Sequence, residues 1–185
     1  MPENAITQAP IMSPEAERFM AFEGLVQWVQ AVVTQSERVS AASERLRSTP
    51  QNPLGHRAAI HEFHSECHYF AIAAHKVFEF RDWVLTFGPL GSVDFAELSQ
   101  FVERDIRDLR NMREHVVDYF KGEGRSHSRW VFETPVYRAD ASSVVGTMIG
   151  GRLDWIAFGD AAKRLLPKLQ AEPIPYPPHP TRPVR

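Results

Sequence analysis

The sequence predicts a mainly α-helical protein, an antiparallel bundle of three to four helices that carries a small β-hairpin. Three long stretches, over residues 14–47, 53–85 and 92–121, repeat apolar residues at helical spacing. Breaks rich in proline and glycine separate these stretches, and short connections favour antiparallel neighbours. After residue 122 the pattern changes to β-branched and aromatic residues around a Gly-Gly pair, which predicts the hairpin.

The composition is that of an ordinary globular protein. The chain has 185 residues, 43 % of them hydrophobic and 24 % charged, which suits one domain with an appendage. A single cysteine excludes an internal disulfide, and no apolar run approaches the roughly 20 residues that cross a bilayer. The net charge of −2 argues against strong non-specific nucleic-acid binding but leaves room for a local basic site. We therefore expect a cytoplasmic protein that does not enter a membrane.

The helical bundle is expected over residues 14–121, after a flexible N-terminus over residues 1–13. Ser13 can cap the first helix, and Pro14 suits its first position. The second helix places Cys67 on its apolar side, where a buried and inert thiol is expected. Ser92 can cap the third helix, which should end near Lys121 because Gly122 follows.

The segment over residues 122–172 is expected to form the β-hairpin and a short C-terminal helix packed on the bundle. Residues 143–149 and 152–158 flank Gly150-Gly151, a plausible two-residue hairpin turn. Asp160 can cap the final helix, which should run from residue 161 to about residue 169.

The last 13 residues, 173–185, are rich in proline and should be disordered or polyproline-like. Such a tail could bind an aromatic groove of a protein partner.

The segment Arg110-Asn111-Met112-Arg113-Glu114-His115 contains residue types suited to RNA cleavage without a metal. Arginine can bind a phosphate through two hydrogen bonds, and histidine can transfer a proton near neutral pH. Asn111 could orient the imidazole or the phosphate. Five residues turn a helix by roughly 500°, so Arg110 and His115 lie about 140° apart in projection. They could still meet one phosphate that lies over the helix or between two symmetry-related helices.

This motif resembles the signature of the HEPN superfamily, in which an arginine, often followed by a polar residue, precedes a histidine after four to six residues. The resemblance implies a helical bundle, a homodimer and an endoribonuclease that leaves a 2′,3′-cyclic phosphate. By the same resemblance, Arg110 would hold the phosphate, His115 would transfer protons and Asn111 would position them. The alternative for these residues is structural, with Arg110 paired to Glu114 and His115 at the edge of the bundle.

A stripe of histidines lies along the second helix, with its members within about 60° of one another in projection. The stripe comprises His61, His64, His68 and His75. His64 and His68, four residues apart, could ligate one metal ion, although the remaining ligands would have to come from elsewhere. The stripe could instead join His115 in one polar groove, or its members could be hydrogen-bonded between helices.

The leading functional hypothesis is a HEPN-like, metal-independent endoribonuclease or an inactive RNA-binding relative, which needs no cofactor. Two alternatives remain open. One is a non-enzymatic bundle that assembles with itself or with another protein, and the other is a metal-binding bundle that uses the histidine stripe.

Overall fold

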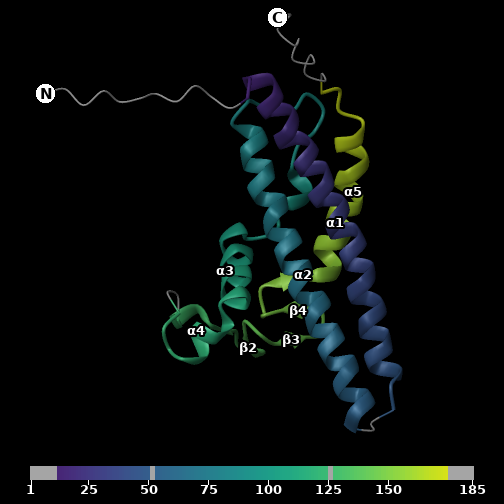
Figure 1. Ribbon diagram of the computed structural model, residues 1–185, viewed down its shortest axis with the longest axis vertical. Coiled ribbons are helices and arrows are strands. Elements are labelled where there is room, and N and C mark those ends of the chain that lie inside the picture. Colours follow the sequence, from purple (N-terminus) through teal and green to yellow (C-terminus); the bar gives the residue numbers. More distant parts are fainter. Residues whose placement is uncertain (1–11, 51–52, 125–126, 175–185) are drawn as a thin grey trace, which may run out of the picture.

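The structure, a computed structural model, describes residues 12–50, 53–124 and 127–174, and it confirms the mainly α-helical fold with a small β appendage (Figure 1). The helical elements in chain order are α1 (Pro14–Ser48), α2 (Pro53–Leu85), the 3-10 turn η1 (Ala96–Leu98), α3 (Glu103–Glu114), α4 (Val116–Phe120), the 3-10 turn η2 (His127–Arg129) and α5 (Trp155–Gln170). The strands are β1 (Val131–Glu133), β2 (Arg138–Asp140), β3 (Val144–Val145), β4 (Met148–Ile149) and β5 (Leu153–Asp154).

The two longest helices, α1 and α2, form an antiparallel hairpin that runs the length of the molecule (Figure 1). As predicted, the Ser13 hydroxyl caps α1 by accepting a hydrogen bond from the Ala16 N–H, and Pro14 occupies the first helical position. The buried residues of α1 recur every three or four positions and pack on α2, where Cys67 and Phe70 are fully buried. The hairpin therefore supplies the rigid frame on which the other elements lie.

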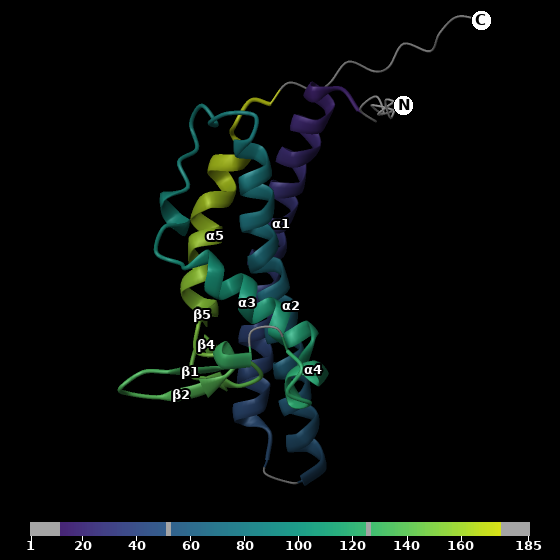
Figure 2. The ribbon, with the colours of Figure 1, turned by 90° about the vertical axis from the view of Figure 1, so that its left-hand side faces the viewer.

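The third member of the bundle is α5, which packs on α1 and α2 (Figure 2). Phe158 of α5 is fully buried, and its ring lies 4.7 Å from that of Phe101 and 5.9 Å from that of Phe78, between ring centroids. A Cβ atom on Gly159 would lie 2.7 Å from the Ser36 Cβ, so the missing side chain allows close approach of α5 to α1. These contacts hold the C-terminal helix firmly in the core.

The prediction of one continuous helix over residues 92–121 is wrong. Residues 92–102 form turns and η1, and α3 begins only at Glu103. Ser92 caps no helix, because its N–H and its hydroxyl both bind the Glu172 carboxylate. A second break follows at His115, where φ of −106° and ψ of 30° leave the α-helical region and separate α3 from α4.

A hairpin at Gly150-Gly151 is confirmed, but its loop and strands differ from the prediction. Ile149 pairs with Leu153, so the loop has three residues in place of two. The segment predicted as one strand, residues 143–149, forms the paired strands β3 and β4, and the strand after the loop is much shorter than predicted. Both glycines have positive φ, 56° and 71°, which is the conformation that a tight turn between β4 and β5 requires. Strand β5 ends at Asp154, whose carboxylate caps α5 by accepting from the N–H groups of Ile156 and Ala157. The final helix therefore begins at Trp155 and not near Asp160, and residues 155–158 are helical.

The remaining β structure is small. Strands β1 and β2 form an antiparallel pair, and β3, β4 and β5 form a three-stranded antiparallel sheet below α5 (Figure 2). Most of the predicted flexible N-terminus and of the proline-rich tail lies outside the described residues. Among the helices that the structure describes, none has the length and apolar character needed to cross a membrane.

Candidate functional site

Helix α3 is amphipathic and lies across α2, on the side of α2 that faces away from α1 (Figures 1 and 2). Ile106, Leu109 and Met112 are buried and fix the orientation of the helix. Asp108 and Asn111 lie on another face at a spacing of three residues, and His115 follows four residues later. The three polar side chains lie near one another, two on α3 and one at the break that follows it.

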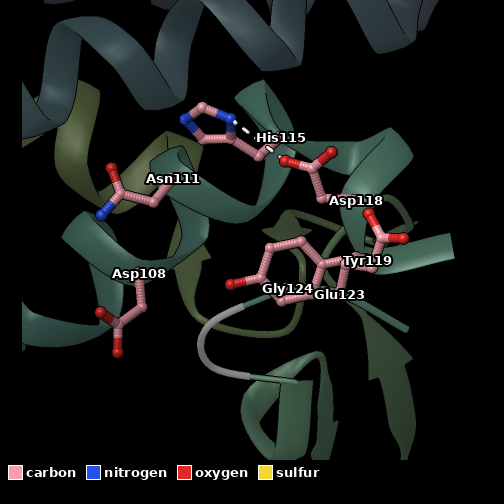
Figure 3. Close-up of a pocket in the computed structure, with 7 residues that line it drawn as sticks. All are labelled: Asp108, Asn111, His115, Asp118, Tyr119, Glu123 and Gly124. Carbon is pink, nitrogen blue, oxygen red and sulfur yellow. Dashed lines mark ion pairs between the residues drawn. The ribbon is translucent and has the colours of Figure 1, made fainter. Parts of the chain in front are cut away.

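These side chains line a pocket of about 540 Å³ at the junction of α3, α4 and the turn after α4 (Figure 3). Three of the lining residues carry carboxylates, so we call it the acidic pocket. Its lining residues are Asp108, Asn111, His115, Asp118, Tyr119, Glu123 and Gly124. His115 and Asn111 therefore share a pocket, and its chemistry is dominated by acidic groups.

The three carboxylates differ in how they are engaged. Asp108 forms an ion pair with Arg129, which also pairs with Asp105. Asp118 lies beside His115, with 3.6 Å between Oδ2 and Nδ1, and half of its side chain remains exposed at 51 %. Glu123 is exposed and forms no ion pair with the described residues. Asp118 and Glu123 are therefore the carboxylates that can meet a ligand.

Tyr119 lines the acidic pocket and belongs to an aromatic cluster with Trp130 and Phe120. Tyr119 is buried and stacks on Trp130, with ring centroids 5.0 Å apart and an interplanar angle of 23°. Phe120 packs edge-on against Trp130 but is 73 % exposed, and Val117 is 58 % exposed. The short helix α4 therefore carries exposed apolar side chains as well as Asp118, which lines the pocket.

Arg110 lies on a different side of α3 from His115. Its Nε lies 2.9 Å from Glu114 Oε2, and its Nη1 donates to Asn111 Oδ1 at 2.9 Å. The guanidinium lies close enough to His68 and His75 on α2 to lower the pKa of both, after the larger effect of burial. His115 therefore lines the acidic pocket and Arg110 does not.

A second pocket of about 330 Å³ lies between α2, the α3–α4 junction and the segment before β3. We call it the histidine pocket, because two members of the histidine stripe line it. Its lining residues are His64, Ser65, His68, Tyr69, Arg113, Val116 and Ser142. In contrast to the acidic pocket, it has no carboxylate among these residues.

Arg113 connects three separate segments beside the histidine pocket. Its Nη1 donates to the carbonyls of Ala141 and Ser142, at 3.0 and 3.2 Å, and its Nη2 donates to the carbonyl of His64 at 3.2 Å. Burial lowers the pKa of Arg113. Burial and the nearby guanidinium also lower the pKa of His64 and of His68, which favours neutral imidazoles at pH 7.

The rest of the histidine stripe does not join this pocket. His61 is exposed, and His75 lies further along α2, 3.8 Å from Glu79 between Nδ1 and Oε2. In the part of the chain that the structure describes, no group of three or more His, Cys, Asp or Glu side chains is placed to hold a metal ion. Cys67 is buried as predicted, and burial raises the pKa of its thiol to about 12.

Two functional features were not predicted from the sequence. The acidic pocket has a signal in the spacing of Asp108, Asn111, His115 and Asp118, which together follow one helical face. The role of Arg113 has no comparable local signal, since its carbonyl partners lie 28, 29 and 49 residues away in the chain. Comparison of the chain with known protein families, curated proteins and solved structures finds no match.

Proposed function

We propose that this chain is a non-enzymatic binding module that recognises a cationic segment of a protein partner at the acidic pocket. One observation carries the proposal: the exposed carboxylates of Asp118 and Glu123 and the side chain of Tyr119 line one pocket of about 540 Å³. Carboxylates attract lysine and arginine side chains, and aromatic faces add a cation–π contribution.

The exposed apolar side chains of α4, which do not line the pocket, would extend the proposed surface. Phe120 and Val117 are both more than half exposed on α4. A partner segment with basic and apolar residues would cover these side chains while a basic group enters the pocket. Aromatic residues that are partly exposed beside charged groups are typical anchors of protein interfaces.

The direct test is calorimetric titration of the full chain with a lysine-rich peptide and with an uncharged peptide of equal length. The double variant Asp118→Asn, Glu123→Gln removes both available charges and should weaken binding of the lysine-rich peptide by about tenfold. The matched control is Glu37→Gln, Glu44→Gln, which removes two exposed charges from α1, on the other side of α2. Equal binding of the two peptides, or an equal loss in both variants, would contradict the proposal.

The endoribonuclease hypothesis has one supporting observation, since His115 is 64 % exposed and shares its pocket with Asn111. Two features oppose it: Arg110 is paired with Glu114 and does not line the pocket, and the nearby carboxylates would repel a phosphate. The hypothesis requires RNA cleavage that persists in a chelator and disappears in His115→Ala. We expect no such cleavage, and its detection would replace the binding proposal.

A further inference from the structure

The histidine pocket is lined by hydrogen-bond donors, with the guanidinium of Arg113 next to two imidazoles. A guanidinium has five N–H groups, and the three hydrogen bonds of Arg113 to backbone carbonyls use three of them. Its Nε is buried and has no hydrogen-bond partner among the described residues. A buried donor without a partner is unfavourable, so the site favours an acceptor that can reach this guanidinium.

The carboxylates around the pocket compensate its positive charge only in part, and each of them has other partners. Asp140 faces His64, but its Oδ1 accepts from the Ser142 and Ser143 N–H groups and from the Ser142 hydroxyl. Glu114 faces His68, but its carboxylate is paired with Arg110. His61, which faces His64, adds no negative charge. A ligand in the pocket would therefore meet Arg113, which forms no ion pair with the described residues.

We propose that the histidine pocket binds a small oxyanion, a carboxylate or a phosphate, through the Arg113 guanidinium and the imidazoles of His64 and His68. Guanidinium and imidazolium groups form charge-assisted hydrogen bonds with both anions. The Ser65 hydroxyl on the pocket wall can add a further donor. This site is independent of the proposed cation-binding function, because it uses different side chains and the opposite charge.

Anion binding at this site would be coupled to proton uptake. In the free protein, burial and Arg113 lower the pKa of both imidazoles, so each is mostly neutral at pH 7. A bound anion favours the protonated imidazoles and raises their pKa. Affinity should therefore increase as the pH falls from about 8 to about 6. Acetate suits this measurement because its own charge does not change in that range.

The test is an NMR titration of the histidine ring signals of the full chain with inorganic phosphate and, separately, with acetate. Sodium chloride keeps the ionic strength constant, and single His→Gln variants assign the signals. We expect saturable shifts of the His64 and His68 signals, a rise of about 1 in their pKa, and no shift at His115. Saturation by both anions indicates an oxyanion site in general, and saturation by phosphate alone indicates a dianion site. Shifts that do not saturate, or that chloride reproduces, would overturn the proposal.

A variant pair sharpens the test. His68→Gln removes one imidazole from the pocket and should weaken phosphate binding by about tenfold. His61→Gln is the matched control, because His61 is exposed on the same helix and does not line the pocket. An equal affinity in the two variants would contradict the role of His68, and the wild-type titration decides the proposal even if His68→Gln does not fold. Neither result depends on whether a lysine-rich peptide binds the acidic pocket.

Discussion

The acidic pocket and the histidine pocket meet at the α3–α4 junction, yet the chain constructs them in opposite ways. The consecutive residues His115 and Val116 line different pockets. In the acidic pocket the carboxylates of Asp118 and Glu123 are exposed, whereas the histidine pocket is formed by half-buried groups that also hold backbone segments together. The difference indicates that charge in the first pocket can change freely, while charge in the second is tied to stability.

The largest expected effect on stability is at Arg113, where charge in the histidine pocket is tied to the fold. Arg113→Met keeps an apolar stem of similar length but removes the donors of three backbone carbonyls. We expect a loss of about 3 kcal/mol in the free energy of unfolding, measured by urea denaturation. The control Arg104→Met changes a side chain that is 70 % exposed and should lose less than about 1 kcal/mol. Similar losses in both variants would remove the proposed distinction between the pockets.

Lowering the pH should have a smaller effect on the free energy of unfolding. Burial is the main cause of the lowered pKa of His64, His68 and His75 in the folded chain. An unfolded chain returns these groups to a pKa of about 6.5 and so binds more protons near that pH. The free energy of unfolding should therefore fall as the pH drops through about 6.5 towards the lowered values.

The measurement is urea denaturation in chloride buffers over this pH range. The double variant His68→Gln, His75→Gln should show a flatter dependence on pH than wild type, whereas His61→Gln should not. A pH dependence that is unchanged in the double variant would show that these two imidazoles are not the groups responsible.

The smallest effect on stability is expected at the acidic pocket. Asp118→Asn with Glu123→Gln should change the free energy of unfolding by no more than about 0.5 kcal/mol, because both side chains are exposed. The same variant should weaken binding of the lysine-rich peptide. A large loss of stability would mean that these carboxylates hold the α4 turn in place, and the contrast with the histidine pocket would then disappear.

The parts of the fold that were predicted correctly are those with local signals. Ser13 and Pro14 mark the start of α1, and the Gly150-Gly151 pair marks the hairpin turn. The region over residues 92–121 was predicted as one helix because Leu98 and Ile106 both fill the core, although only Ile106 does so from a regular α-helix. Buried residues on a 3-10 turn and on a helix produce the same apolar spacing, and only tertiary contacts distinguish them.

The candidate site was predictable to a similar extent. The segment from Arg110 to His115 does lie at a pocket, but the side that each residue faces depends on where α2 packs against α3. The separation of about 140° between Arg110 and His115 was visible in the sequence. The sequence did not show whether Arg110 or His115 would face α2, because that depends on the burial of Leu109 and Met112.

Asp154 serves two elements at once, because it pairs with Met148 as the last residue of β5 and caps α5. No linker separates β5 from α5, so the strand fixes which side of the helix faces the core. Inserting a single residue after Asp154 would turn α5 by about 100° and carry Phe158 out of the core. The same insertion at Val136, which is 88 % exposed between β1 and β2, would be absorbed locally. Insertions and deletions in relatives of this chain should therefore occur in the β1–β2 loop and not at the β5–α5 boundary.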